Sequence, residues 1–158
     1  MDLNEFFKKY EFIHAAAIIH DSEGRHTFEL QDKFKPKGEF GDKYGWVYIW
    51  VGVFQGRPDI PLYVGKAGQT QTLRQRFSQH KQGFYTSQTG IKNSGRILDF
   101  FNTNPNHDIW IYARHSESGS AFDVNGISLC EFEEMALIKK LQIENNILWN
   151  FSRSLIHK

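Results

Sequence analysis

The sequence predicts an α+β fold with a small antiparallel or mixed sheet, and three observations support this class. Two neighbouring segments rich in β-branched and aromatic residues are separated by a turn with Gly and Pro, which indicates a β-hairpin. Segments before and after it have apolar residues at steps of three and four, which indicates helices. The resulting order is helix, two strands, two helices, strand, helix. A chain of 158 residues can form one core and is too short for two independent domains.

In the first half of the chain, the elements follow from residue spacing and turn formers. Apolar residues recur at helical steps from Leu3 to Ile19, which predicts an amphipathic helix. The polar stretch 20–45 contains many turn formers, so we expect a loop with a short strand around His26 to Leu30. The segments GWVYIWVGVF (45–54) and PLYVG (61–65) then form the predicted hairpin.

In the second half, we expect two helices, a strand and a further helix. The segment QTLRQRFSQHKQGF predicts a helix that is closed by Gly83. The segment SGRILDFFNTNP predicts a second short helix that stops before Pro105. HDIWIYARH (107–115) predicts the third strand, and a long polar loop follows it. The strongest helical pattern of the chain is SLCEFEEMALIKKLQIENN (128–146).

The composition bears on the compartment of the protein. The single cysteine, Cys130, rules out an internal disulfide framework and fits a reducing compartment. The apolar run from Ala15 to Ile19 is too short for a secretory core or a membrane span. We therefore expect a soluble, cytoplasmic protein that does not enter a membrane.

Positive charge is concentrated in one segment, although the net charge of the chain is only +1. No aspartate or glutamate occurs between Asp59 and Asp99, whereas this window contains a histidine and six cations: His80, Lys66, Arg74, Arg76, Lys81, Lys92 and Arg96. Such a segment can present a positive surface that attracts phosphate groups. The alternative is an ordinary solvated face that binds no ligand.

An acidic residue lies on the apolar face of the last predicted helix. At about 100° per residue, Glu134 falls near the middle of a stripe formed by Cys130, Leu137, Ile138 and Leu141. A buried carboxylate is costly unless a positive group receives it, and the candidates are a metal ion, an arginine from another element or a capping role. Glu131 lies at the edge of the stripe, and we expect Glu133 to face solvent.

The helix after the hairpin places a cation and an imidazole on one face, because Arg76 and His80 are four residues apart. A guanidinium suits a phosphate clamp because it forms two parallel hydrogen bonds and keeps its proton. Lys66 follows Gly65 at the end of the second hairpin strand, where glycine permits close approach of a ligand.

Each hairpin strand also contains a tyrosine that alternates with apolar residues. Tyr48 and Tyr63 are either core aromatics or, beside cations or a metal-bound water, proton acceptors. A phosphate clamp, a metal-binding carboxylate and a phenol that accepts a proton together indicate hydrolysis of a phosphodiester.

These residues resemble the motifs of the GIY-YIG nuclease superfamily. WVY (46–48) is similar to a degraded first half-motif, and YVG (63–65) is similar to the second. YVGKA followed by LRQRF resembles GIY-YIG restriction endonucleases and the incision subunit of bacterial excision repair. EMALIKK resembles the glutamate helix of the family, and LWN (148–150) resembles the segment with its supporting asparagine. The resemblance extends over about residues 44–150.

The resemblance implies a three-stranded antiparallel sheet flanked by helices, in one nuclease domain over 1–158 with 1–43 as an N-terminal extension. It also implies Mg²⁺ or Mn²⁺ bound by Glu134, phosphate contact by Arg76 and support from Lys66. A tyrosine or His80 would transfer the proton. Since the turn before the helix is longer than in the simplest members, Arg74 competes with Arg76 for the clamp.

The supporting asparagine is ambiguous, because the distance from Glu134 to Asn150 is about one helical turn longer than expected. Asn146 is therefore a rival to Asn150 for this role.

The leading functional expectation is a metal-dependent endonuclease that cuts double-stranded DNA, of the type II restriction class. Residues for DNA contact are expected at Arg74, Lys81, Lys92 and Arg96, and segments 87–96 and 113–126 are candidate groove-binding loops. By analogy with restriction enzymes, a palindromic target would favour a homodimer. The alternatives are a repair, mobile-element or phage-defence nuclease that acts on structured DNA or RNA, and a nucleic-acid-binding module without catalytic activity.

Overall fold

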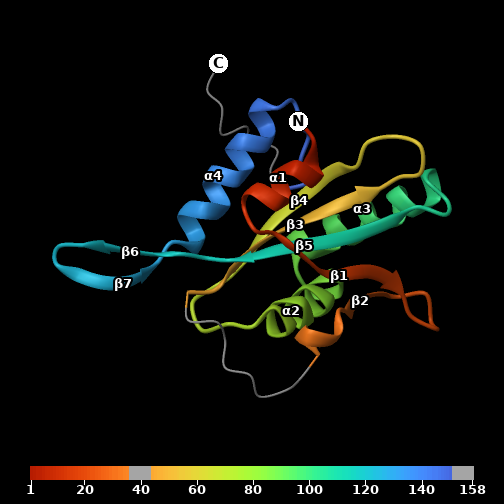
Figure 1. The fold of residues 1–158 in the computed structure, drawn as a ribbon. Coiled ribbons are helices and arrows are strands. Elements are labelled where there is room, and N and C mark those ends of the chain that lie inside the picture. Colours follow the sequence, from red (N-terminus) through yellow and green to blue (C-terminus); the bar gives the residue numbers. More distant parts are fainter. Residues whose placement is uncertain (36–43, 151–158) are drawn as a thin grey trace.

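The structure is a computed structural model that describes residues 1–35 and 44–150. Its centre is an antiparallel sheet of five strands in the order β2-β1-β5-β3-β4 (Figure 1). These strands are β1 (Ile13–His20), β2 (His26–Leu30), β3 (Trp46–Val53), β4 (Ile60–Ala67) and β5 (Asp108–His115). The predicted α+β class is confirmed, but the expected three-stranded sheet was too small. β3, β4 and β5 are the predicted strands, and β1 and β2 extend the sheet beyond β5.

The predicted helix from Leu3 to Ile19 is wrong in its second half. Helix α1 (Leu3–Lys9) ends early, and Glu11 adopts a φ of 61°, which an α-helix does not permit. The chain then enters β1, where Ala15 and Ala16 are fully buried between neighbouring strands. Strand pairing and burial override the helical preference of alanine here.

The polar stretch that follows contains the expected short strand, which is β2. A short 3-10 helix, η1 (Asp32–Phe34), follows it. The remainder of the predicted loop, residues 36–43, lies outside the described residues.

Two helices in the middle of the chain are longer than predicted. Helix α2 (Leu73–Thr86) continues through Gly83, which therefore does not cap it. Helix α3 (Gln88–Thr103) begins directly afterwards, with the Ser87 hydroxyl accepting a hydrogen bond from the Gly90 N–H at 2.9 Å. The expected flexible loop over 87–96 is therefore wrong, because residues 88–96 belong to α3 and Ser87 caps it. No helix among the described residues is long and apolar enough to cross a lipid bilayer.

The long polar loop expected after β5 is wrong, because most of this segment forms two strands. It forms a separate hairpin of β6 (Ser118–Ala121) and β7 (Val124–Ser128), which projects from the rest of the molecule (Figure 1). Helix α4 (Cys130–Ile143) follows and is the helix predicted with most support.

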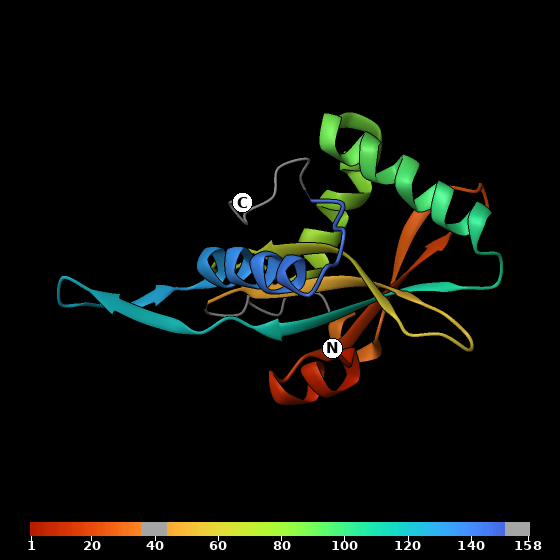
Figure 2. The same ribbon diagram turned by 90° about the horizontal axis from the view of Figure 1, so that it is seen from above.

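The central sheet has a hydrophobic cluster on each face, because side chains of β3 alternate between the faces. In Figure 2, α2 and α3 lie on one side of the sheet and α1 lies on the other. The first cluster includes Tyr48, Trp50, Phe77, Phe84, Ile97 and Phe100. The second includes Phe6, Phe7, Val47, Ile49, Val64, Leu137, Ile138 and Leu141, so α1 and α4 pack on the same cluster.

Candidate active site

The hydroxyl of Tyr48 is the centre of a polar cluster between β3 and α2. Arg76 Nε donates a hydrogen bond to the Tyr48 oxygen at 3.3 Å, and His80 Nε2 lies 2.6 Å from the same oxygen. Because Arg76 can only donate, the Tyr48 proton is free to point to His80. His80 then accepts at Nε2 and carries its own proton on Nδ1. Three of the predicted site residues are therefore in direct contact.

The sequence produces this cluster through strand and helix periodicity. Tyr48 pairs with Gly65 across the hairpin and Trp50 pairs with Tyr63, so the two tyrosines point to the same face of the sheet. On α2, Arg76 and His80 are one turn apart and face this side of the sheet. The start of α2 is fixed by Thr72, whose side chain forms a reciprocal capping box with the third residue of the helix.

Gly65 makes room for the Tyr48 ring. A Cβ atom at this position would lie 2.5 Å from Cε2, Cζ and the hydroxyl oxygen of Tyr48. The glycine is therefore required by the close approach of a side chain from the paired strand. The sequence suggested close approach of a ligand at Gly65, and in the structure a phenol occupies that space.

Burial controls the protonation of this cluster. Burial, together with the smaller effect of the adjacent Arg76 guanidinium, lowers the pKa of His80 to about 3. Burial also raises the pKa of Tyr48 and of Tyr63 above the ordinary value, although Arg76 opposes the increase. At neutral pH both phenols and the imidazole are therefore uncharged, and the guanidinium is the cation among them.

Glu134 approaches the cluster from α4. The apolar stripe predicted for this helix is buried, and Glu134 is half-buried beside it. Burial raises the pKa of Glu134, while the charges of Lys66 and Arg76 lower it. α4 packs on the opposite face of the sheet from α2, and β4 is an edge strand. The charges of Lys66 and Arg76 therefore reach the Glu134 carboxylate near the β4 edge, where the two faces of the sheet join.

Lys66 contacts a different acid of the same helix. Its Nζ forms an ion pair with Glu131 at 2.8 Å, and this Glu131 side chain is 80% exposed. The hydrogen bond and charge of Lys66 lower the pKa of Glu131. Glu131 thus holds Lys66 close to α4, and the charge of Lys66 also lowers the pKa of Glu134.

The two candidate asparagines have different contacts. The Asn150 side chain bonds both backbone groups of Val64 in β4: its Oδ1 accepts from the Val64 N–H at 2.8 Å, and its Nδ2 donates to the Val64 carbonyl. The Asn146 Nδ2 donates to the Leu141 carbonyl at 2.9 Å and so closes the end of α4. Asn150 therefore lies beside the strand that carries Tyr63 and Gly65, whereas Asn146 satisfies its own helix.

The cations expected to contact nucleic acid are distributed around the cluster. Arg74 donates to the Lys35 carbonyl at 2.5 Å and does not join Arg76. Arg96 donates to the Trp149 carbonyl and to Asn93 Oδ1, so it connects α3 to the segment that contains Asn150. Lys81 on α2 and Lys92 on α3 are exposed. Arg76 is therefore the arginine that the structure brings to the tyrosines.

Comparisons with known proteins bear on the fold of this chain. No family model matches the sequence, and no curated protein matches it either. Among solved structures, it matches a glutamate-to-alanine mutant of bacteriophage T4 EndoII, a GIY-YIG-type nuclease, with a TM-score of 0.59. The chain therefore shares its overall fold with EndoII. The match covers 90% of this chain and 95% of EndoII at 17% sequence identity, so it shows the fold alone.

The acidic side chains near the cluster determine whether a divalent metal could bind there. Among residues 1–35 and 44–150, no group of three or more His, Cys, Asp or Glu side chains could hold a metal ion. Mg²⁺ is often bound by one or two carboxylates, with waters and substrate phosphates completing the shell. Glu134, with Glu131 close enough to affect its pKa, fits that arrangement and does not fit an all-protein cage.

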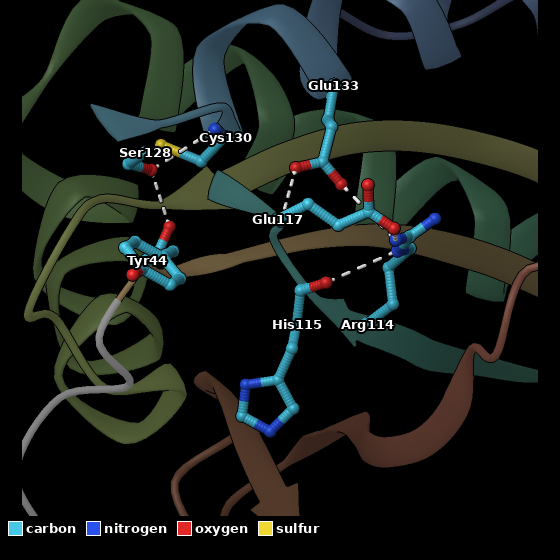
Figure 3. A network of polar contacts seen from close by, with 7 residues as sticks. All are labelled: Tyr44, Arg114, His115, Glu117, Ser128, Cys130 and Glu133. Atoms are coloured by element: carbon cyan, nitrogen blue, oxygen red, sulfur yellow. Dashed lines mark hydrogen bonds and ion pairs between the residues drawn. The ribbon is translucent and has the colours of Figure 1, made fainter. Parts of the chain in front are cut away.

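The prediction that Glu133 faces solvent is wrong. Figure 3 shows its carboxylate directed to the segment that joins β5 to β6. Glu133 Oε2 accepts a hydrogen bond from the Glu117 N–H at 2.9 Å, and Oε1 lies 3.6 Å from Nη2 of Arg114. Burial raises the pKa of Glu133 although both contacts lower it. Helical periodicity could not show this, because the partner is the base of a hairpin that was not predicted.

Sequence reasoning also missed Gln79. Its Oε1 accepts hydrogen bonds from Arg76 Nη1 at 3.2 Å and from Gln71 Nε2 at 2.9 Å, so it helps to orient the guanidinium. The signal was present, since Gln79 lies three residues after Arg76 on the same helix face. Trp50 was missed as well, although strand alternation from Tyr48 places it beside Tyr63, with ring centroids 4.5 Å apart.

Proposed function

We propose that this protein is a metal-dependent endonuclease that hydrolyses DNA phosphodiester bonds, of the restriction type. The observation that carries the proposal is the hydrogen-bonded set of Tyr48, Arg76 and His80, with Glu134 in electrostatic contact with Arg76. The cationic, phenolic and imidazole groups are in contact, and the charge of Arg76 also acts on the Glu134 carboxylate from a third element, α4. Their convergence supports phosphodiester chemistry more strongly than any of the motifs alone.

Arg76 is proposed to bind the scissile phosphate. A guanidinium has five N–H donors, and the described contacts engage its Nε with Tyr48 and its Nη1 with Gln79. These two contacts orient the group, and its remaining donors can form charge-assisted hydrogen bonds to phosphate oxygens. The same cation would stabilise the negative charge that increases on the phosphate in the transition state.

Tyr48 and His80 are proposed to move the proton of the attacking water. A dianionic transition state beside them would favour the protonated imidazole and so reverse the effect that burial has on the pKa of His80. Tyr48 could then accept a proton from water while it passes its own proton to His80 Nε2, 2.6 Å away. Neither group would need to carry a charge before the substrate binds.

Glu134 is proposed to hold Mg²⁺ or Mn²⁺, with Lys66 and Glu131 beside it. A bound divalent ion would neutralise phosphate charge and polarise the phosphorus–oxygen bonds. Ionised Glu134 is required for this role, because a protonated carboxyl is a poor ligand. Lys66 helps to keep Glu134 ionised, since its charge lowers the pKa that burial raises.

Cutting of a supercoiled plasmid in Mg²⁺ tests the proposal. The native chain is expected to nick or linearise the plasmid, and Glu134→Ala is expected to leave it intact while still binding it. Glu144→Ala is the matched control, because this acid lies at the end of the same helix and pairs with Lys140. If both the native chain and Glu134→Ala bind DNA and neither cuts it, the protein is a binding module instead.

A second candidate keeps the chemistry and changes the substrate. EndoII is a phage protein, which favours a mobile-element or phage-related nuclease that acts on structured nucleic acid. Purified duplexes, branched DNA and RNA offered to the same enzyme would separate the candidates. Cleavage at one duplex sequence supports the restriction type, and preference for junctions or RNA supports the second candidate.

A further inference from the structure

Two uncharged groups orient the guanidinium of Arg76. Its Nε donates to the Tyr48 hydroxyl at 3.3 Å, and its Nη1 donates to Gln79 Oε1 at 3.2 Å. None of the ion pairs formed within residues 1–35 and 44–150 includes Arg76. The guanidinium is therefore held in place while no carboxylate in contact neutralises its charge.

Gln79 is held in turn by Gln71, which lies in the turn between β4 and α2. Gln71 Nε2 donates to Gln79 Oε1 at 2.9 Å, and Gln71 Oε1 accepts a hydrogen bond from the Gly68 N–H at 3.2 Å. The backbone N–H of Gln71 also donates to the Gly68 carbonyl at 2.9 Å. A continuous chain of hydrogen bonds thus runs from the Gly68 backbone through two side-chain amides to Arg76.

These partners determine which way each amide points. Gln71 faces the Gly68 N–H with its oxygen, so its nitrogen faces Gln79. The guanidinium of Arg76 can only donate, so Gln79 must present its oxygen to both neighbours. Reversal of either amide would place a donor against a donor. Gln79 therefore needs an acceptor, whereas Gln71 needs an acceptor and a donor.

The anchor of this chain of hydrogen bonds lies at the end of β4. Gly68 directly follows Ala67, the last residue of β4, which pairs with Trp46 of β3. Lys66 is the residue before Ala67 in the same strand. The two amides therefore fix the position of Arg76 on α2 relative to the strand that carries Lys66, the second cation of the site.

The residue type at position 79 suits a site for an anion. A glutamate there would bind the guanidinium more strongly, because both groups would be charged. It would also neutralise the cation and repel a phosphate. No aspartate or glutamate occurs between Asp59 and Asp99, and the amide of Gln79 orients Arg76 without adding negative charge.

We propose that Gln71 and Gln79 are positioning residues, which hold the Arg76 guanidinium ready for a phosphate and leave its charge intact. Gln79 acts by direct contact, and Gln71 acts through Gln79. The inference rests on the proposed function, in which the scissile phosphate is the ligand of Arg76. A clamp that is ordered before the substrate binds loses less side-chain freedom during the reaction.

Side-chain NMR of the free protein tests the orientation without any substrate. In the native chain the Nη protons of Arg76 are expected to give separate signals, which are assigned by their absence from Arg76→Lys. Gln71→Met and Gln79→Met should each merge or broaden them, because the guanidinium then rotates freely. Gln82→Met is the matched control, since Gln82 is an exposed glutamine of the same helix. Unchanged thermal unfolding midpoints would show that the variants are folded.

Cleavage kinetics test the consequence for the reaction. Gln71→Met and Gln79→Met should lower kcat by about tenfold and leave KM nearly unchanged, as expected for groups that act on the transition state. Gln79→Glu keeps the acceptor, so the separate Arg76 signals should persist. Its kcat/KM should nevertheless fall by about tenfold or more, because the carboxylate neutralises the clamp.

The two measurements separate the possible failures. Arg76 signals that neither Gln71→Met nor Gln79→Met changes would overturn the proposal, and a change in Gln79→Met alone would remove Gln71 from it. Near-native cleavage by Gln79→Glu would refute the advantage of an uncharged partner. A native chain that leaves plasmid DNA intact would refute the proposed function, and the NMR signals would still decide whether the two amides orient Arg76.

Discussion

The hydroxyl of Tyr48 lies 2.6 Å from Nε2 of His80, and this contact couples a strand of the sheet to the helix that packs on it. Because burial lowers the pKa of His80 to about 3, the imidazole is neutral and accepts the phenol proton. The proposed proton pathway depends on this contact.

Tyr48→Phe should reduce cleavage by about 10²-fold or more, because it removes the hydroxyl that would accept the proton of the attacking water. Binding of DNA should persist, since Arg76 is retained. Single-turnover cleavage and a binding isotherm measure the two effects. Tyr85→Phe is the control, because Tyr85 lies on α2 and is 52% exposed. Near-native cleavage by Tyr48→Phe would exclude this phenol as the proton acceptor.

Arg76→Ala should abolish turnover, whereas Arg74→Ala should mainly weaken DNA binding. Arg76 contacts the Tyr48 hydroxyl, and Arg74 donates to the Lys35 carbonyl instead. A loss of about 10²-fold or more in the cleavage rate is expected for a group that stabilises transition-state charge. His80→Ala should impair cleavage less than Arg76→Ala. Equal and near-normal rates in all three variants would contradict the assigned clamp.

Glu134 links activity and stability to pH in opposite directions. Burial raises the pKa of Glu134 in the folded chain, so the stability contributed by its protonated form is lost as pH rises through that value. Glu134→Gln should therefore melt at a higher temperature than the native chain at neutral pH, and the difference should shrink in acid. The cleavage rate of the native chain should instead increase as pH rises through the Glu134 pKa, because metal binding needs the ionised carboxylate. Calorimetry and cleavage assays over the same pH series measure both trends.

Gly65→Ala should damage the site without removing a functional group. The added Cβ would lie 2.5 Å from the Tyr48 ring and hydroxyl, so the phenol must move away from Arg76 and His80. Overpacking of this kind costs about 1–3 kcal/mol in the free energy of unfolding. We expect a lower midpoint in denaturant and a loss of cleavage. Gly56→Ala offers a comparison at a turn where no atom lies within 4 Å, although its φ of 77° adds strain of its own.

Glu133→Ala should destabilise the protein more than Glu131→Ala. Glu133 accepts a hydrogen bond from the Glu117 N–H and lies near Arg114, whereas Glu131 is exposed. Removal of the Glu133 acceptor should cost about 1 kcal/mol, and chemical denaturation measures it. An equal effect of the two substitutions would show that the hairpin base does not depend on Glu133.

The residues that sequence reasoning placed correctly are those whose position follows from local periodicity. Glu134 on the apolar face of α4, and Arg76 and His80 on one face of α2, follow from the fixed rotation per residue of a helix. Each of these conclusions needed only one element. The contacts between the elements were then supplied by the fold.

The errors occurred where distant partners determine the structure. The alanines of β1 favour a helix in isolation, and their strand conformation depends on β5, almost a hundred residues away. The β6–β7 hairpin lacks the Asn-Gly or Asp-Gly turn that usually identifies such a structure, because Phe122 and Asp123 occupy its turn. Glu133 was placed in solvent for the same reason, since its partner belongs to that hairpin.

Asn150, which bonds both backbone groups of Val64, protects one edge of the sheet from pairing with other molecules. β4 borders the sheet, and an unprotected border strand can recruit a strand from another molecule and start aggregation. The Asn150 amide occupies the N–H and carbonyl of Val64, and the Trp149 N–H bonds the Leu62 carbonyl at 2.7 Å. The end of the described chain thus takes the place of a sixth strand and blocks this border against unwanted pairing.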